Sequence, residues 1–286
     1  MNTIINTIKL LRFPFSVFLL PISLFSFFYI QPQFTYQLCL ILFIWHILIF
    51  PSSNGYNSYH DQDEGPIGGL AAPPKPTKHL LYISNFMDGL AIFLSIFINW
   101  YFVLFASIYI IASRLYSNRK IRLKKFPIIG FLVVFFLQGA WVFCANIFAL
   151  SSISLFSNQS IIFSAIASSF FIGTIYPLTQ IYQHEADIKD EVKTLSILLG
   201  KKGTFIFSGL MFLMANLFIY LSFNNKINIS NFWMFNLMML PSTIYFLIWS
   251  IISFKNEAHI TFRNTMIMLV LSSLLTNFYF SILLLK

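Results

Sequence analysis

The chain has 286 residues, of which 58% are hydrophobic and only 9% are charged. Soluble globular domains carry about a quarter charged residues, so this composition excludes an ordinary soluble protein. The formal net charge is +9, but the basic residues lie in short loops between apolar segments, where they set membrane orientation, so we do not expect nucleic-acid binding. Cys39 and Cys144 lie inside apolar segments and predict neither a disulfide framework nor a metal site.

Residues 1–12 predict a short amphipathic helix at the membrane surface. Apolar runs of about 20 residues, each long enough to cross a bilayer, then recur to the end of the chain. The first run resembles a signal peptide because it follows Lys9 and Arg12, but it is too long and lacks a small-residue cleavage site. The predicted spans are 13–30, 35–52, 80–98, 100–113, 127–150, 159–180, 204–223, 232–253 and 265–285.

The distribution of basic residues orients these nine spans. With a cytoplasmic N-terminus, every Lys and Arg except Lys226 and Lys286 falls in a cytoplasmic segment. One miscounted span would abolish this bias. We therefore predict an all-α integral membrane protein: one domain over residues 1–286, with nine transmembrane helices in a bundle and the N-terminus in the cytoplasm.

The second predicted span continues into a stretch rich in amides and acids, which precedes the Gly- and Pro-rich loop 65–76. In a helix, Asn54, Asn57, Asp61 and Glu64 follow the spacing i, i+3, i+7 and i+10 and share one face. Carboxylate and amide oxygens on such a face suit a hard divalent cation. This stretch is the first candidate metal motif.

A second acidic cluster follows the sixth predicted span, and the two clusters together hold every acidic residue except Asp88 and Glu257. A polar helical stripe enters this cluster from the span and comprises Tyr176, Gln180, His184, Asp187 and Glu191. Charged loops are usually only solvated. Polar side chains that continue into a membrane helix, however, usually face the bundle interior and mark a site. We therefore predict a functional cavity on the cytoplasmic side.

The two clusters and a basic loop at 116–124 suit a phosphorylated ligand. Mg²⁺ bridges carboxylate and phosphate oxygens, and Arg and Lys neutralise the remaining charge. Apolar helices around the site suit a hydrocarbon tail, so an isoprenyl diphosphate meets both requirements. Its C–O bond breaks when cations stabilise the leaving diphosphate.

Three segments also resemble the UbiA superfamily of intramembrane prenyltransferases. They are Asn57-x-x-x-Asp61 with the following acids, Asp187 seven residues before Thr194, and the basic stretch from Tyr116 to Lys124. The resemblance covers almost the whole chain, because that family has nine helices with both motifs on the cytoplasmic side. Two motifs in the right order, joined by the basic loop, make it specific.

The resemblance implies that Asn57 and Asp61 hold one Mg²⁺, that Asp187 holds another, and that Arg122 and Lys124 bind the diphosphate. The complete set of predicted metal ligands is Asn57, Asp61, Glu64, Asp187 and Glu191. The predicted catalytic residues are Asp61 and Asp187, and the predicted diphosphate ligands are Arg122, Lys124 and Lys193. Side chains predicted to line or support the site are Asn54, Asp63, Tyr176, Gln180, Gln183, His184 and Glu185.

Two positions depart from the family pattern: Gly65 and Gln183 stand where the motifs usually carry acids. Neighbouring acids could substitute, for example through the register Asp187-x-x-x-Glu191, or the activity could be altered. Asp88 in the third span could be a catalytic or acceptor-binding acid, or it could form a structural hydrogen bond inside the helix.

The leading hypothesis is a Mg²⁺-dependent prenyltransferase that joins an isoprenyl diphosphate to a lipophilic acceptor from the membrane, with a quinone-ring precursor as one candidate. The alternatives are a terpene cyclase on the same scaffold and a catalytically degenerate protein that binds cations or lipids. Against a transporter, acids are nearly absent from the span centres. The sequence indicates no oligomeric state and no prenyl chain length.

Overall fold

The computed structural model describes residues 2–31, 35–151, 158–226 and 229–285. These residues form helices, with no strand among them, so the all-α prediction is confirmed for the part of the chain described. The α-helices are α1 (Asn2–Leu11), α2 (Leu20–Ile30), α3 (Tyr36–Phe43), α4 (Phe50–Asp61), α5 (Lys78–Ser95), α6 (Trp100–Ser117), α7 (Pro127–Phe136), α8 (Val142–Leu150), α9 (Gln159–Gln180), α10 (His184–Lys189), α11 (Leu195–Lys226), α12 (Ile229–Lys255) and α13 (Phe262–Leu284).

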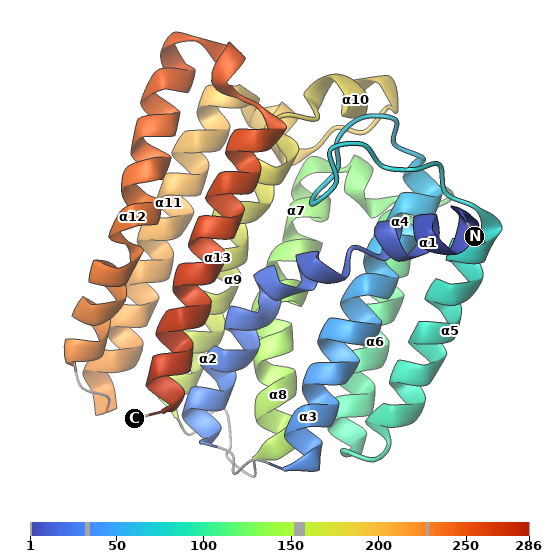
Figure 1. Ribbon diagram of the computed structural model, residues 1–286. Coiled ribbons are helices and arrows are strands. Elements are labelled where there is room, and N and C mark those ends of the chain that lie inside the picture. Colours follow the sequence, from blue (N-terminus) through green and yellow to red (C-terminus); the bar gives the residue numbers. More distant parts are fainter. Residues whose placement is uncertain (1, 32–34, 152–157, 227–228, 286) are drawn as a thin grey trace.

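Eight helical segments are long and apolar enough to cross a membrane: Thr3–Ile30, Tyr36–Asp61, Trp100–Ser117, Pro127–Leu150, Gln159–Gln180, Leu195–Asn224, Ile229–Lys255 and Phe262–Leu284. The predicted span 80–98 corresponds to α5, which packs beside α6 (Figure 1) but is not among the eight. Polar residues such as Lys78, His79 and Asp88 lower the hydropathy of α5. Eight of the nine predicted spans thus correspond to helices able to cross a membrane, and both the count of nine and the orientation stay predictions.

Two of the long spans contain π-helical turns. One turn, η2 (Ile44–Ile49), joins α3 to α4, and the other, η4 (Leu137–Trp141), joins α7 to α8. The remaining short turns are 3-10 helices: η1 (Phe13–Leu19), η3 (Leu123–Lys125) and η6 (Glu257–His259). π-Helical turns inside an α-helix are rare and occur often at functional sites.

The turn η4 packs very closely against α9. A Cβ atom at Gly139 would lie 2.3 Å from the backbone Cα of Ser169, so only glycine fits there. The Ser169 hydroxyl accepts a hydrogen bond from the backbone N–H of Ala140 (3.0 Å) and thereby satisfies a donor of the π-helical turn. Small residues permit such close helix contacts in membranes.

The bundle brings three distant segments to one end. The end of α4, the loop between α6 and α7, and α10 all lie at the same end of the molecule (Figure 1). We call this the charged end, because it carries Asp61, the basic loop 116–124 and Asp187. The chain leaves α4 through Gln62, whose left-handed φ of 55° ends the helix.

We predict that Gly139→Ala destabilises the protein by about 1–3 kcal/mol, because the added methyl group meets fixed backbone of α9. Its apparent melting temperature in detergent should fall. The matched control is Gly89→Ala on α5, where an added Cβ meets no atom within 4 Å. Alanine favours helix there, so the melting temperature should stay level or rise. Equal losses in both variants would contradict this account.

Candidate active site

One wall of the site is the C-terminal end of α4, which lies at the charged end of the molecule. Asn54, Asn57 and Asp61 line a single cavity between the helices, as does Asp63 in the following loop. The Oδ1 atom of Asn57 accepts a hydrogen bond from Ser117 (2.9 Å), which orients this amide from α6. The helix has ended before residue 64, and Glu64 is exposed and outside the cavity lining.

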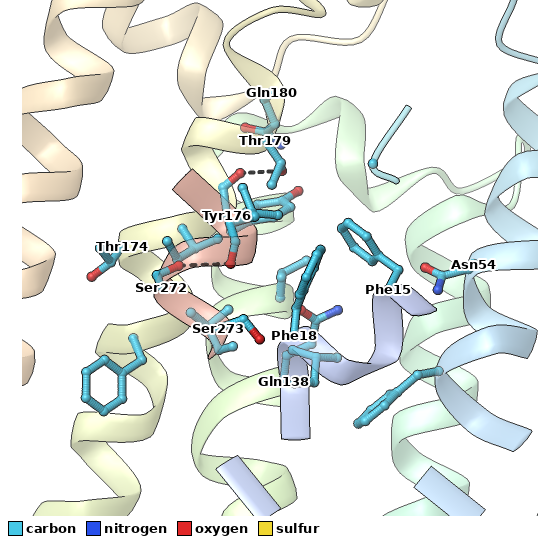
Figure 2. A pocket seen from close by; sticks show the side chains of 18 of the residues that line it. Phe15, Phe18, Asn54, Gln138, Thr174, Tyr176, Thr179, Gln180, Ser272 and Ser273 are labelled. Atoms are coloured by element: carbon cyan, nitrogen blue, oxygen red, sulfur yellow. Dashed lines mark hydrogen bonds between the residues drawn. The ribbon is translucent and has the colours of Figure 1, made fainter. Parts of the chain in front are cut away.

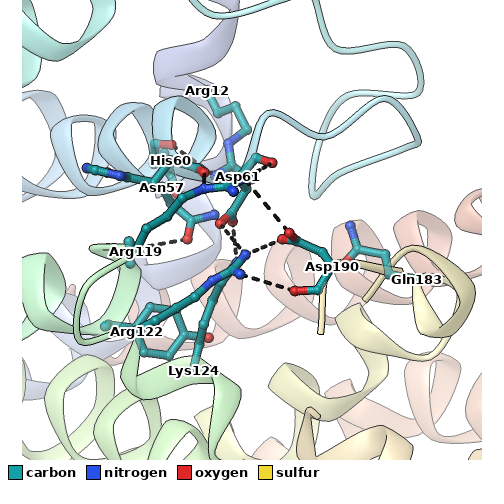
Figure 3. A network of polar contacts seen from close by, with 12 residues as sticks. Arg12, Asn57, His60, Asp61, Arg119, Arg122, Lys124, Gln183 and Asp190 are labelled. Atoms are coloured by element: carbon teal, nitrogen blue, oxygen red, sulfur yellow. Dashed lines mark hydrogen bonds and ion pairs between the residues drawn. The ribbon is translucent and has the colours of Figure 1, made fainter. Parts of the chain in front are cut away.

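The basic loop closes over Asp61 (Figure 3). Lys124 Nζ lies 2.5 Å from Asp61 Oδ2, and Arg122 Nη2 lies 3.5 Å from Asp61 Oδ1. Arg122 is buried and also forms an ion pair with the Asp190 carboxylate and donates to the Asp190 carbonyl (3.1 Å). Arg119 lies 3.8 Å from Asp190 and donates to the carbonyl of Asp61 (3.3 Å). Arg122 thus joins the two acidic clusters directly.

The second wall comes from the end of α9 and from α10. Tyr176, Gln180, Gln183 and Asp187 line the cavity. The Tyr176 hydroxyl is hydrogen-bonded to that of Tyr116 on α6. Gln183 Nε2 donates a hydrogen bond to the Pro66 carbonyl (2.8 Å). Gln183, which stands where the family motif usually carries an acid, therefore links the segment before α10 to the loop after α4.

The other predicted residues of the second cluster lie outside the cavity lining. Glu185, Glu191 and Lys193 are exposed. Glu191 has a left-handed φ of 56°. The backbone is therefore not helical at this residue, and the helical spacing that predicted Glu191 to face the site does not apply. His184 instead forms a hydrogen bond with Ser196 through Nε2 (2.7 Å).

The sequence interpretation missed Arg12, which lines the same cavity. Its guanidinium donates to the carbonyls of Gly68 (3.2 Å) and Asn54 (3.3 Å), and its Nε atom is buried without a partner in the described part of the chain. The sequence alone predicts a surface helix at this position. An arginine at the start of a long apolar run was the available signal, because such a charge enters a membrane bundle only with polar partners.

The cavity has a volume of about 350 Å³ and is lined mainly by apolar side chains (Figure 2). Its charged lining residues are Arg12, Asp61, Asp63, Lys124 and Asp187. Asp88 is not among the lining residues; it is buried and bonded to Ser52 and Arg114. This placement favours the structural alternative for Asp88.

The carboxylates at the mouth of the cavity are only partly compensated. Burial raises the pKa of the Asp187 carboxyl to about 7; Lys124 opposes the rise, and Asp63 and Asp61 add to it. Burial likewise raises the pKa of Asp63 to about 6, with Asp61 adding to the rise. A further cation at this point would relieve the cost of ionising both groups.

The sequence comparisons identify the family. A model described as the UbiA prenyltransferase family matches residues 18–283. The chain belongs to this family. A comparison with curated protein sequences finds no match.

Solved structures share the UbiA fold. A structure of digeranylgeranylglyceryl phosphate synthase is 18% identical to this chain with a TM-score of 0.65, and the match covers 100% of this chain and 100% of that chain. A UbiA homolog from Archaeoglobus fulgidus bound to DMAPP and Mg²⁺ is 17% identical with a TM-score of 0.67, covering 97% of this chain and 99% of that chain. The same homolog bound to GPP and Mg²⁺ is 19% identical with a TM-score of 0.66, covering 96% and 99%. At these identities the likeness shows the fold alone.

The residues at the mouth fit a divalent metal. Asp187 Oδ2 is a buried oxygen without a hydrogen-bond partner among the described residues, and the buried Asp61 Oδ1 has only the ion pair with Arg122 at 3.5 Å. Within the described residues, no three acidic, His or Cys side chains converge to form a complete cage. Mg²⁺ does not need one, because it is usually held by one or two carboxylates together with waters and substrate phosphates.

We predict that Arg122→Gln lowers the affinity for inorganic diphosphate in the presence of Mg²⁺ by about tenfold or more, because it removes charge-assisted hydrogen bonds from the mouth. Isothermal titration of detergent-purified protein measures this. The matched control is Lys125→Gln in the same loop. Its side chain is exposed and, unlike that of Arg122, pairs with neither acidic cluster among the described residues, so its loss should change the affinity by less than about twofold. Equal effects of the two substitutions would contradict the assignment.

Proposed function

We propose that this UbiA-family protein is a prenyltransferase that transfers the prenyl group of an isoprenyl diphosphate to a lipophilic acceptor from the membrane. The observation that carries the proposal is the joining of two acidic motifs and a basic loop at the mouth of a largely apolar cavity between membrane helices. The A. fulgidus homolog with DMAPP or GPP and Mg²⁺ supports the same donor class.

In this proposal the diphosphate lies at the mouth and the hydrocarbon tail lies in the cavity. Lys124, Arg122 and Arg12 supply positive charge from the basic loop and from the start of the first span. The present partners of Arg122 and Lys124 are carboxylates, so these cations exchange part of that contact for phosphate oxygens when the donor binds. Lys193, the third predicted diphosphate ligand, is exposed, and we do not include it in the proposed diphosphate site.

Asn57, Asp61, Asp63 and Asp187 would hold Mg²⁺, since all four line the mouth. Glu64 and Glu191, the other two predicted ligands, point to solvent. Bound Mg²⁺ supplies electrostatic stabilisation of the negative charge that develops on the leaving diphosphate. Asp61 and Asp187 are therefore the two acids on which turnover should depend most.

The chemistry follows from these positions. The bond between C1 of the prenyl group and the diphosphate oxygen breaks, and its electron pair leaves with the diphosphate, where Arg122 and Lys124 stabilise the charge. In this proposal the positive charge left on the prenyl group lies near Tyr116 and Tyr176, two aromatic side chains that line the cavity and are of the kind that stabilises a cation. An electron pair of the acceptor then forms a bond to C1, and the acceptor loses a proton to solvent. The apolar walls limit competing attack by water.

The charged end is proposed to face the cytoplasm. Nearly all basic residues of the described loops lie on this side of the spans, which is the pattern of cytoplasmic segments. Donor would then enter from the cytoplasm and acceptor from the bilayer.

We predict that detergent-purified protein releases diphosphate from isoprenyl diphosphates only with Mg²⁺ and a membrane lipid extract. Asp61→Asn and Asp187→Asn should each lower this rate by more than about 100-fold, because each removes a metal ligand. The matched control is Glu64→Gln, an exposed acid whose change should alter the rate by less than about twofold. Labelled donor identifies the product.

The same assay separates the alternatives. Diphosphate release that needs no extract would replace the transferase with a terpene cyclase. No release under any condition, with the protein shown to be folded, would favour a degenerate cation- or lipid-binding protein. Full activity of Asp187→Asn would overturn the metal assignment at that residue.

A further inference from the structure

The short helix that carries Asp187 is held mainly by polar contacts. α10 has six residues, and none of them is buried. Among the described residues, the nearest buried apolar side chains in the sequence are Ile181, before the helix, and Val192, after it. Burial of apolar surface stabilises a segment in proportion to the area removed from water, so it anchors the two flanks of α10 but not the helix itself.

The position of the Asp187 carboxylate depends on the backbone of α10. The side chain lines the mouth of the cavity, its Oδ2 atom is buried without a hydrogen-bond partner, and none of the ion pairs formed by the described residues includes it. The backbone N–H of Asp187 donates to the Gln183 carbonyl (2.9 Å), and the Asp187 carbonyl accepts from the backbone N–H of Val192 (2.8 Å). A displacement of α10 would therefore carry this carboxylate away from the mouth.

The polar contacts at the two ends of α10 differ in what they join. After the helix, Asp190 is paired with Arg122 of the basic loop (Figure 3). In the proposed function Arg122 exchanges part of this contact for phosphate oxygens, so the pair weakens when the donor binds. Gln183, directly before the helix, is bonded to another loop, the one after α4. At the first residue of the helix, the Nε2 atom of His184 is hydrogen-bonded to the Ser196 hydroxyl (2.7 Å). His184 thus joins α10 to the membrane helix α11.

Ser196 belongs to a break in α11 that holds its hydroxyl in place. Gly200 has φ 68° and ψ 170°, a conformation that is essentially restricted to glycine, and it interrupts the helix. In an uninterrupted helix Ser196 and Thr204 would lie about 12 Å apart along the axis, whereas across the break their side-chain oxygens are 2.9 Å apart. Both residues are fully buried, and the Thr204 hydroxyl donates to the Gly200 carbonyl (2.8 Å). His184 therefore binds a fixed, buried hydroxyl.

We infer that His184 is a positioning residue: its hydrogen bond to Ser196 anchors α10 to the break in α11 and so holds Asp187 at the mouth, where Asp187 can bind Mg²⁺. The inference rests on the proposed function and gives a part in it to a side chain that lies outside the cavity lining. His184 itself touches neither the metal nor the donor. Side chains that orient metal ligands from outside the coordination sphere commonly control metal affinity.

Metal affinity separates this role from a contribution to stability alone. His184→Leu should weaken binding of Mg²⁺ in the presence of inorganic diphosphate by about fivefold or more, because α10 is no longer held. Isothermal titration of folded, detergent-purified protein measures this. His184→Gln, whose amide can still bond to Ser196, should stay within about twofold of the wild type. The matched control is Ile188→Ala at an exposed position of the same helix, with an effect below about twofold. Wild-type affinity in His184→Leu would overturn the inference.

Ser196→Ala tests the same bond from α11 and decides the matter if His184→Leu does not fold. It should weaken Mg²⁺ binding as much as His184→Leu does. The double variant should bind Mg²⁺ no more weakly than either single variant, because all three lack the same hydrogen bond. Fully additive losses would show that the two side chains act separately and would overturn the inference, as would wild-type affinity in Ser196→Ala.

Hydrogen exchange without any ligand separates this inference from the proposed function. The backbone amides of residues 184–192 should exchange faster in His184→Leu and Ser196→Ala than in the wild type, and at the wild-type rate in His184→Gln, because a segment that loses its anchor opens more often. Failure of the wild type to bind Mg²⁺ with diphosphate would contradict the proposed function, while the exchange rates would still decide whether His184 anchors α10. Unchanged exchange in both His184→Leu and Ser196→Ala would overturn the inference.

Discussion

The buried guanidinium of Arg122 is the constraint on which the geometry of the site depends. It comes from the loop between α6 and α7 and is paired with Asp61 at the end of α4 and with Asp190 after α10. Removing one partner of a buried ion pair typically costs about 3–5 kcal/mol, so three segments that are distant in the sequence hold one another in place. The two acidic motifs are therefore assembled before any ligand binds. The network already contains the cations that a diphosphate requires.

Polar contacts inside the bundle support this arrangement. Arg114 on α6 is paired with Asp88 on α5, and its guanidinium lies 3.9 Å from the centroid of the Tyr56 ring on α4. The hydroxyl of Tyr56 in turn accepts a hydrogen bond from Asn118 at the start of the basic loop (3.0 Å). These contacts set the position of α4 relative to the loop that carries Arg122. They explain why a buried acid and a half-buried arginine occur in helices that otherwise face lipid and apolar neighbours.

The mouth of the cavity and its interior are lined by different kinds of side chain. Among the described lining residues, the charged ones belong to the charged end or contact it, where water and phosphate can compensate them, and the rest of the lining is apolar, aromatic or polar without charge. This division follows from the cost of burying an unpaired charge in a membrane protein. It allows a charged head group to remain at the charged end while the rest of both substrates stays among the helices.

The amino-acid sequence by itself determined the helical membrane architecture, because a long apolar run can satisfy its backbone in a bilayer only as a helix. It also determined the face shared by Asn54, Asn57 and Asp61, since periodicity is reliable inside a helix. Only the tertiary structure decided which acids beyond the helix ends enter the site. At Gln62 and Glu191 the backbone turns left-handed, and the helical spacing that favoured Glu64 and Glu191 no longer applies. Asp63, which the sequence predicted only as a lining residue, reaches the mouth instead, Asp190 pairs with Arg122, and Arg12 lines the cavity, because packing between helices sets the directions of these side chains.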